Sequence, residues 1–269
     1  MAIKLGGGGG SASFPTIFLH KSQTWVPPQD GNIMIHVIGA GGSGSGSTTT
    51  SQLQSGGAGG YCRKDSLAVT TSSSFTVVIG AGGAVNARGV LGNGVDGGTT
   101  TVSGTGLSAT LTATGGARGI LNTAAFSNGG VGSNGDFNTT GGRGGYHKGG
   151  GAVGLLGTGR DGTNPSDYYT STGGDCDIVG DFYSSSLGQI SGSLGPATVV
   201  AHTSFKNGAG DANAGPLAGA GSTFMYGAPA AGTCNATIGG GGGFSFSNTL
   251  AYALAGKGGE GCVVIQYIP

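Results

Sequence analysis

Charged side chains are scarce in this sequence. Only 8% of its 269 residues are Asp, Glu, Lys or Arg, where about 25% is usual. Eleven basic residues balance eleven acidic ones, so the formal net charge at pH 7 is zero. A nucleic-acid-binding protein needs a basic surface to neutralise phosphates. The neutral composition therefore excludes the electrostatic footprint of that class, and we expect no nucleic-acid partner.

Long hydrophobic runs are also missing. No apolar stretch reaches the roughly 20 residues that a membrane-spanning helix needs, so we expect no membrane insertion. The first ten residues contain one lysine and few apolar residues before their glycines, which is not the pattern of a secretory signal peptide. We therefore expect a protein that is released in the cytoplasm where it is made.

Motifs of catalysis and of metal binding are absent or weak. The histidines show no HxH or HExxH spacing, there is no G-x-S-x-G elbow, and no paired carboxylates stand out. A metal site at Asp175-Cys176-Asp177 stays open as a weak alternative, because no histidine lies nearby. We predict a non-enzymatic protein without cofactor or metal. Buried free thiols are expected for all four cysteines, which lie far apart: Cys62, Cys176, Cys234 and Cys262.

Glycine is what the sequence has in excess. It supplies 65 residues, roughly a quarter of the chain, against about 7% in ordinary proteins. Disorder is one interpretation, since glycine loses the most backbone entropy on folding. However, 36% of the residues are apolar, and runs of strand character frame the glycine blocks. A folded chain is the better interpretation.

The apolar runs predict short β-strands. Residues 32–38 (NIMIHVI) form the clearest one; they are β-branched and apolar on both faces, so we expect burial on both sides, with His36 as a core histidine. Residues 75–79 and 262–268 have the same character, and residues 107–113 alternate. Two shorter runs, 16–19 and 24–26, precede a turn at 27–31. No segment has a convincing 3.6-residue apolar period, so α-helix should be nearly absent.

The glycine blocks have a spacing of three. The pattern GGxGG occurs at 56–60 and 141–145, the same spacing recurs at 116/119, 129/132/135 and 256–261, and residues 239–243 are all glycine. A polyproline-II-type helix has three residues per turn and no internal hydrogen bonds. Such helices can pack backbone to backbone, provided that neighbouring helices supply the hydrogen-bond partners. We predict an all-β and irregular fold: a short β-strand base plus a packed bundle of polyglycine-II helices, with residues 239–243 in the most enclosed position. The alternative is a set of flexible glycine loops.

The stretch VIGAGGSG at 37–44 contains the G-x-G-x-x-G spacing of a dinucleotide-binding turn. That site requires a helix after the glycines, and residues 43–55 are a poor helix candidate. VIGAGG also recurs at 78–83. We interpret both copies as junctions at which a buried strand passes the chain to a polyglycine helix.

Several acidic residues lie in glycine turns. Asp96, Asp136, Asp161 and Asp211 weakly resemble the calcium-binding β-roll repeat, which needs tandem nine-residue spacing. Their intervals are irregular, so turn formation is the expected role.

Aromatic residues gather in the segments between glycine blocks. Tyrosine with Ser, Gly and Asn is also the composition of antibody loops, in which rigid aromatic rings supply contact area. Capping the bundle or filling small cores is the alternative for any single residue. The candidate receptor-binding residues are Asp167, Tyr168, Tyr169, Phe182, Tyr183, Phe224, Tyr226, Phe244 and Phe246.

Residues 18–42 (FLHKSQTWVPPQDGNIMIHVIGAGG) resemble the opening of glycine-rich domains at the tips of bacteriophage tail fibres. Residues 258–267 (GGEGCVVIQY) resemble the closing block of those domains, and FTVVIGAGG resembles their internal strand. The resemblance implies an adhesin in the virion, at the tail-fibre tip, assembled in the host cytoplasm. Its variable loops on a rigid polyglycine-II scaffold would recognise an outer-membrane protein or a glycan of the host surface.

The resemblance divides the chain into an N-terminal tail or attachment segment, 1–13, and a glycine-rich receptor-binding domain, 14–269. Only the short tail precedes the first strand, whereas one branch of the family attaches through a separate N-terminal domain. Contact with other tail-fibre or virion proteins is expected, and a homotrimer that matches fibre symmetry is one option. A structural virion or surface decoration or spacer protein without receptor is the alternative function.

Overall fold

The structure is a computed structural model that describes residues 16–46, 54–85, 91–121, 125–145, 158–159, 161, 223–225, 239–242, 244–247 and 252–269. Its sheets are predominantly antiparallel, and no helix occurs in the part of the chain that it describes. The all-β prediction is confirmed.

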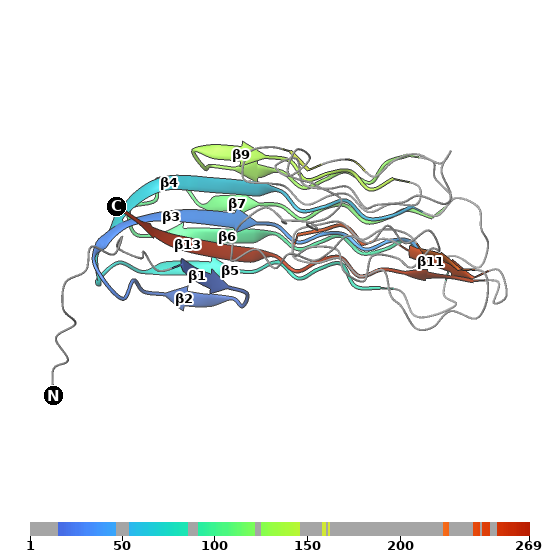
Figure 1. Cartoon of the computed structure of the whole chain (residues 1–269), viewed down its shortest axis with the longest axis horizontal. Helices are drawn as coiled ribbons and strands as arrows, with labels where there is room; N and C mark the ends of the chain where they lie inside the picture. Colours follow the sequence, from blue (N-terminus) through green and yellow to red (C-terminus); the bar gives the residue numbers. More distant parts are fainter. Residues whose placement is uncertain are drawn as a thin grey trace, which may run out of the picture.

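Two five-stranded sheets form the base of the molecule (Figure 1). All neighbours within each sheet are antiparallel. The first sheet has the order β1 (Thr16–Leu19), β13 (Cys262–Ile268), β3 (Gly31–Ile38), β4 (Tyr61–Val69), β9 (Phe137–Thr139). The second has the order β2 (Gln23–Trp25), β5 (Phe75–Val78), β6 (Thr100–Gly104), β7 (Leu111–Ala113), β8 (Gly132–Ser133).

The two sheets enclose one apolar core. Ile33, Ile35 and Val37 of β3 face it on alternate positions, as the two-residue period of a strand requires. Phe75 and Val102 of the second sheet pack from the other side, and the ring of Trp25 lies 5.6 Å from that of Phe75. His36 and Ile38 on the opposite face of β3 are also buried. The prediction of burial on both sides is therefore confirmed for residues 35–38, whereas Asn32 at the start of the strand is exposed and Met34 is half-buried.

The strands predicted at 16–19, 24–26, 32–38, 75–79 and 262–268 are present with small shifts at their ends. The strand predicted for the alternating run 107–113 is wrong in its extent, because only Leu111–Ala113 is a strand. Gly104 and Gly106 take positive φ values of 155° and 79° and turn the chain before it. Leu107 still packs against the core from this turn. The sequence did not predict β4, β6, β8 or β9.

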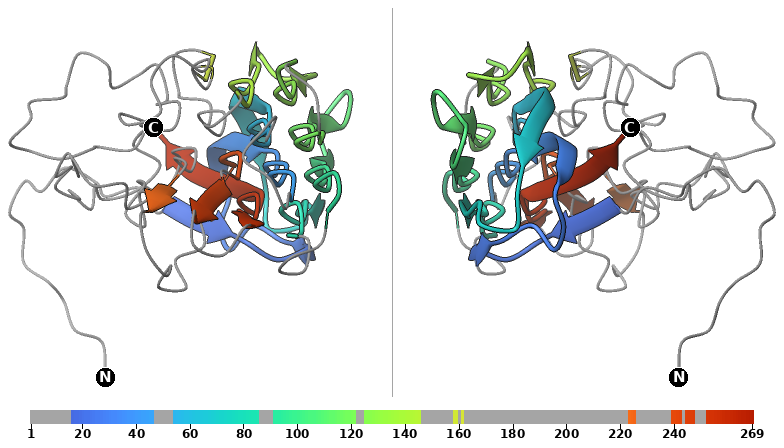
Figure 2. Two further views of the ribbon diagram at one scale, coloured as in Figure 1. Left: turned by 90° about the vertical axis from the view of Figure 1, so that its right-hand side faces the viewer. Right: turned by 90° about the vertical axis from the view of Figure 1, so that its left-hand side faces the viewer.

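Strands of the base continue directly into extended glycine segments that run side by side along the long axis (Figures 1 and 2). Residues 39–46 follow β3, residues 80–83 follow β5, and residues 256–261 lead into β13. Both VIGAGG copies lie at such junctions, and no helix follows either of them within the described residues. The geometry is not that of a dinucleotide-binding turn.

The backbone N–H groups of residues 39–46 donate to three neighbouring segments in rotation, over N···O distances of 2.8–3.2 Å. Every third residue bonds to the same neighbour, which is the period of a helix with three residues per turn. A strand in a sheet, by contrast, has at most two neighbours. Positions 39, 42 and 45 donate to 60, 57 and 54; positions 40, 43 and 46 donate to 98, 95 and 92; positions 41 and 44 donate to 259 and 256.

Carbonyl groups of residues 39–46 accept from three further segments, at residues 116–119, 83 and 242. The segment therefore has six hydrogen-bonded neighbours, and all of its residues are buried. Residues 55–60 follow the same rule, donating in rotation to residues 142–145, 239–242 and 114–117. This is the hydrogen-bond arrangement that the expected polyglycine-II bundle requires. Residues 239–242 are buried within it, but the central place belongs to residues 39–46.

Glycine is required where the segments touch. A Cβ added to Gly41 would lie 1.8 Å from the carbonyl oxygen of Gly240, and one added to Gly57 would lie 2.2 Å from that of Asn128. Neither contact is possible without moving a backbone apart from its neighbour. Ala40 and Ala58 occupy the remaining face of their segments and are fully buried.

Candidate functional site

A third sheet lies at the end of the glycine bundle opposite the C-terminus (Figure 1). It consists of β10 (Thr223–Met225), β11 (Phe244–Ser247) and β12 (Tyr252–Ala255). β10 is parallel to β11, and β11 is antiparallel to β12. We call these three strands the distal sheet.

Bundle segments adjoin the distal sheet in the chain. Residues 239–242 precede β11, and residues 256–261 follow β12 and lead to β13. Gly239 and Gly242 accept hydrogen bonds from Gly59 and Gly56 at 2.8 and 2.9 Å. Gly258 and Gly261 donate to Gly83 and Gly80 at 3.0 and 2.9 Å. The distal sheet is therefore joined to the base through hydrogen-bonded backbone.

Three candidate receptor-binding residues lie in the distal sheet. Phe224 is in β10, Phe244 and Phe246 are in β11, and the register pairs Phe224 with Phe246. The structure thus brings three aromatic positions from two segments of the chain together. The other candidates lie outside the described residues: Asp167, Tyr168, Tyr169, Phe182, Tyr183 and Tyr226.

We call the two five-stranded sheets the sandwich, the array of hydrogen-bonded glycine segments the bundle, and their exposed outer edge the rim. Acidic side chains in glycine turns accept backbone hydrogen bonds at this rim. Asp96 accepts from the N–H of Arg118, Asp136 from that of Asp65, and Asp161 from that of Arg143, over 2.7–2.8 Å. Glu260 accepts from Gly82 in the same way at 3.0 Å. These carboxylates complete the hydrogen bonding of outward-directed N–H groups. The fourth aspartate of this kind, Asp211, lies outside the described residues.

Arg143 is the only residue with a side chain in the block 141–145, and this side chain contacts two neighbours at the rim. Its guanidinium donates to Asp161 over 2.6 and 2.8 Å and lies 4.7 Å above the centre of the Phe126 ring. Partial burial raises the pKa of Asp161, but the hydrogen bonds and the charge of Arg143 outweigh it, so that the pKa is lowered. Asp161 is thus ionised, and both of its carboxylate oxygens accept hydrogen bonds from Arg143.

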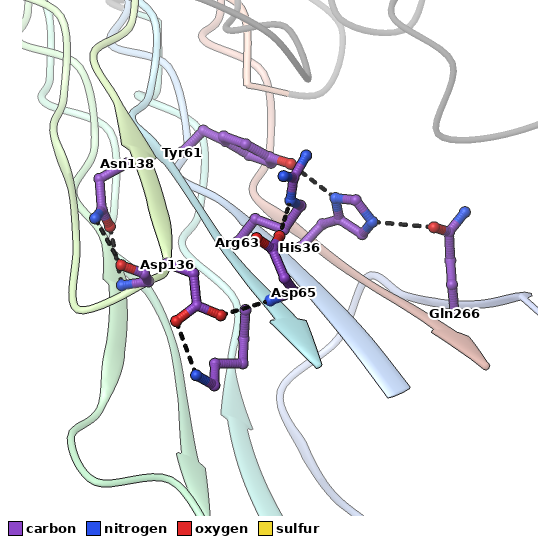
Figure 3. A network of polar contacts seen from close by, with 9 residues as sticks. His36, Tyr61, Arg63, Asp65, Asp136, Asn138 and Gln266 are labelled. Atoms are coloured by element: carbon purple, nitrogen blue, oxygen red, sulfur yellow. Dashed lines mark hydrogen bonds and ion pairs between the residues drawn. The ribbon is translucent and has the colours of Figure 1, made fainter. Parts of the chain in front are cut away.

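A polar network crosses the outer face of the first sheet (Figure 3). Tyr61 on β4 donates to Nδ1 of His36 on β3 at 2.7 Å, and Nε2 of His36 donates to Gln266 on β13 at 3.1 Å. This is the tautomer of a neutral imidazole that satisfies both partners. At the partly exposed edge, Lys64 pairs with Asp136 at 2.8 Å, which lowers the pKa of that carboxyl.

Burial lowers the pKa of His36 to about 4, so its ring is neutral at physiological pH. Burial also raises the pKa of the Cys62 and Cys262 thiols to about 11. Both cysteines are free and buried, which confirms the prediction for these two; Cys176 and Cys234 lie outside the described residues. Sequence reasoning missed Tyr61, Arg63 and Gln266 as partners of this network. The signal was Arg63-Lys64-Asp65, three charged residues in a row in a chain with little charge.

The described residues contain no group of three or more His, Cys, Asp or Glu side chains that is arranged to hold a metal ion. No helix of the described part has the length and apolar character to cross a membrane.

Comparison with known families gives one match. Residues 17–268 match the family described as a glycine-rich domain. No curated protein matches the chain.

Proposed function

The chain belongs to the glycine-rich domain family, and on that premise we propose that it is an adhesin, the receptor-binding protein at the tip of a bacteriophage tail fibre. Its place would be the virion, with assembly in the host cytoplasm. It would act without catalysis, and its partners would be a host surface receptor and other tail-fibre or virion proteins. The resemblance of residues 18–42 and 258–267 to such tips supports the proposal.

One observation carries the proposal, namely the polarity of the molecule. The sandwich and the C-terminus lie at one end, and the distal sheet with three candidate aromatic residues lies at the other (Figure 1). A fibre-tip protein needs this separation, because one end must attach to the virion while the other meets the host.

The bundle between the two ends suits the proposed task. Its segments are joined by backbone hydrogen bonds to several neighbours at once. Loops and strands on a rigid scaffold lose less conformational entropy when they bind, so more of the contact energy remains as affinity.

The test is adsorption of the purified protein to host cells. Alanine substitutions of Phe244 and Phe246, and separately of Tyr168 and Tyr169, should weaken binding at least about tenfold, as expected when aromatic contact residues are truncated. Phe18→Ala is the matched control, because Phe18 is an aromatic residue of the base and 44% exposed. Each variant must keep the wild-type melting temperature.

The proposal is overturned if the wild-type protein binds no host cell. It is also overturned if every alanine variant, at Phe244, Phe246, Tyr168 and Tyr169, binds as well as wild type. The alternative of a structural virion or decoration protein predicts the first of these outcomes.

A further inference from the structure

The segment that contains the distal sheet has no charged residue. Between residues 212 and 256 there is no Asp, Glu, Lys, Arg or His, although the chain has eleven acidic and eleven basic residues elsewhere. All three strands of the distal sheet lie within this interval. The acidic side chains described at the rim, including Asp96, Asp136 and Asp161, come from other parts of the chain.

Side chains alternate between the two faces along a strand, so the register assigns the positions of the distal sheet to two faces. Phe224, Phe244 and Phe246 belong to one face. Thr223, Ser245 and Ser247 belong to the other, and Tyr252 joins them there because it pairs with Ser247. One face of a sheet without charge thus combines an aromatic position, Tyr252, with hydroxyl-bearing neighbours.

From this placement we propose that the distal sheet binds a neutral carbohydrate of the host surface; the inference rests on the proposed adhesin function. A sugar ring presents C–H groups that pack on aromatic rings, and hydroxyl groups that exchange hydrogen bonds with Ser, Thr and Tyr side chains, each both donor and acceptor. Neither kind of contact needs a charged residue.

The other ligand classes fit less well. Phosphate-bearing glycans and lipid headgroups are recognised by Arg and Lys, which the interval lacks. The centres of protein–protein interfaces are rich in Trp, Tyr and Arg. Of these three residue types the interval contains only tyrosine, at 226 and 252. It has no Arg, and the one tryptophan of the chain, Trp25, is buried in the sandwich core.

The experiment uses the full chain and host cells treated in two ways. Periodate oxidises the vicinal diols of surface sugars, and protease removes surface protein. We expect binding to be lost after periodate and retained after protease. It should also change less than about twofold between roughly 0.05 and 0.5 M salt, because no ion pair forms with the ligand. Purified neutral polysaccharides (dextran, mannan and a galactan) and a phosphate-bearing lipopolysaccharide serve as direct probes.

Two substitutions locate the effect. Tyr252→Ala should reduce binding to the retained neutral polysaccharide at least tenfold, and Tyr252→Phe, which keeps the ring, should retain most of it. Phe18→Ala at the base is the control for an aromatic residue elsewhere and should bind like wild type.

Binding that resists periodate but not protease, that falls steeply with salt, or that requires the phosphate-bearing probe overturns the carbohydrate inference while the adhesin proposal stands. Binding to a neutral polysaccharide that Tyr252→Ala leaves unchanged also overturns it, because the ligand then lies elsewhere. If untreated host cells are not bound at all, the adhesin proposal itself fails.

Discussion

At the scale of the residue, the bundle reverses the usual relation between side chains and stability. In an ordinary core, removing a methyl group leaves a cavity and costs stability. Here the contacts are between backbones, so that adding a methyl group does the damage. Gly57 and Gly241, whose added Cβ atoms would lie 2.2 and 2.0 Å from carbonyl oxygens, are the clearest positions.

We therefore expect Gly57→Ala to lower the free energy of unfolding by about 3 kcal/mol or more, because two hydrogen-bonded segments must separate. Ala58→Gly, one residue away, is the control; it removes a methyl that fits and should cost only about 1 kcal/mol. Chemical denaturation of both variants measures the difference. Equal losses for the two would contradict backbone contact at Gly57.

His36 makes stability depend on pH. Its pKa is about 4 in the folded protein against 6.5 ordinarily, so between these values the unfolded chain binds a proton that the folded chain does not. The free energy of unfolding should therefore fall as the pH drops from 6.5 towards 4, by about 3 kcal/mol in all. In His36→Gln this contribution should disappear, so the stability gap between variant and wild type should vary with pH in that window.

A direct measurement is the titration of the His36 ring by NMR. An imidazole that titrates near pH 6.5 would show that the ring is not buried as described. Asp136 acts in a different window: its lowered pKa stabilises the folded protein above the ordinary value of 3.8, and this stabilisation is lost as the pH falls through the lower folded value.

At the scale of the element, the glycine segments differ in how many partners they have. Residues 39–46 have six neighbouring segments and are wholly buried, whereas residues such as Asn93 and Asp96 at the rim are exposed. Amide exchange should follow this difference, since buried, hydrogen-bonded amides exchange only when the surrounding structure opens.

We expect the amides of residues 39–46 and 54–60 to be the most protected of the bundle, close to the global unfolding limit. The amides of Arg118 and Leu121 at the rim, which donate to the exposed side chains of Asp96 and Asn93, should exchange faster. Hydrogen–deuterium exchange with mass spectrometry tests this order. Rapid exchange across residues 39–46 would favour the flexible-loop interpretation of the glycine blocks.

The elements also show how far the sequence could be interpreted. β3, β5 and β13 were predictable because their β-branched runs are buried on at least one face. β4 was not, because Arg63, Lys64 and Asp65 interrupt its apolar pattern, and only the network on the outer face explains them. For the distal sheet, the sequence pointed only to separate aromatic residues and predicted none of the three strands. Its parallel pairing of β10 with β11 joins positions about 20 residues apart, and no local pattern specifies it.

At the scale of the whole molecule, two kinds of core share one chain. The sandwich buries apolar side chains, and the bundle buries hydrogen-bonded peptide groups with few side chains. Exposure of apolar surface raises the heat capacity of unfolding, and exposure of polar surface lowers it.

The heat capacity change of unfolding should therefore fall clearly below the ordinary value of about 12–15 cal/mol/K per residue. The stability curve should be correspondingly flat with temperature. Differential scanning calorimetry of the full chain measures this quantity. A value at or above the ordinary range would mean that the chain buries far more apolar surface than the sandwich core accounts for.

The three-residue period of the bundle leaves the glycine segments without a unique alignment of their own. A segment that slides by three residues against its neighbours recovers the same hydrogen bonds and returns its small side chains to equivalent places. The attached strand forbids this shift, because an odd slip turns its core-facing side chains outward. Only a slip of six residues satisfies both the two-residue period of the strands and the three-residue period of the bundle. Such a slip is almost as long as β3 and β13 themselves, which have eight and seven residues. The strand pairing in the sandwich therefore fixes the alignment of the glycine segments, which the three-residue period of the bundle alone leaves undetermined.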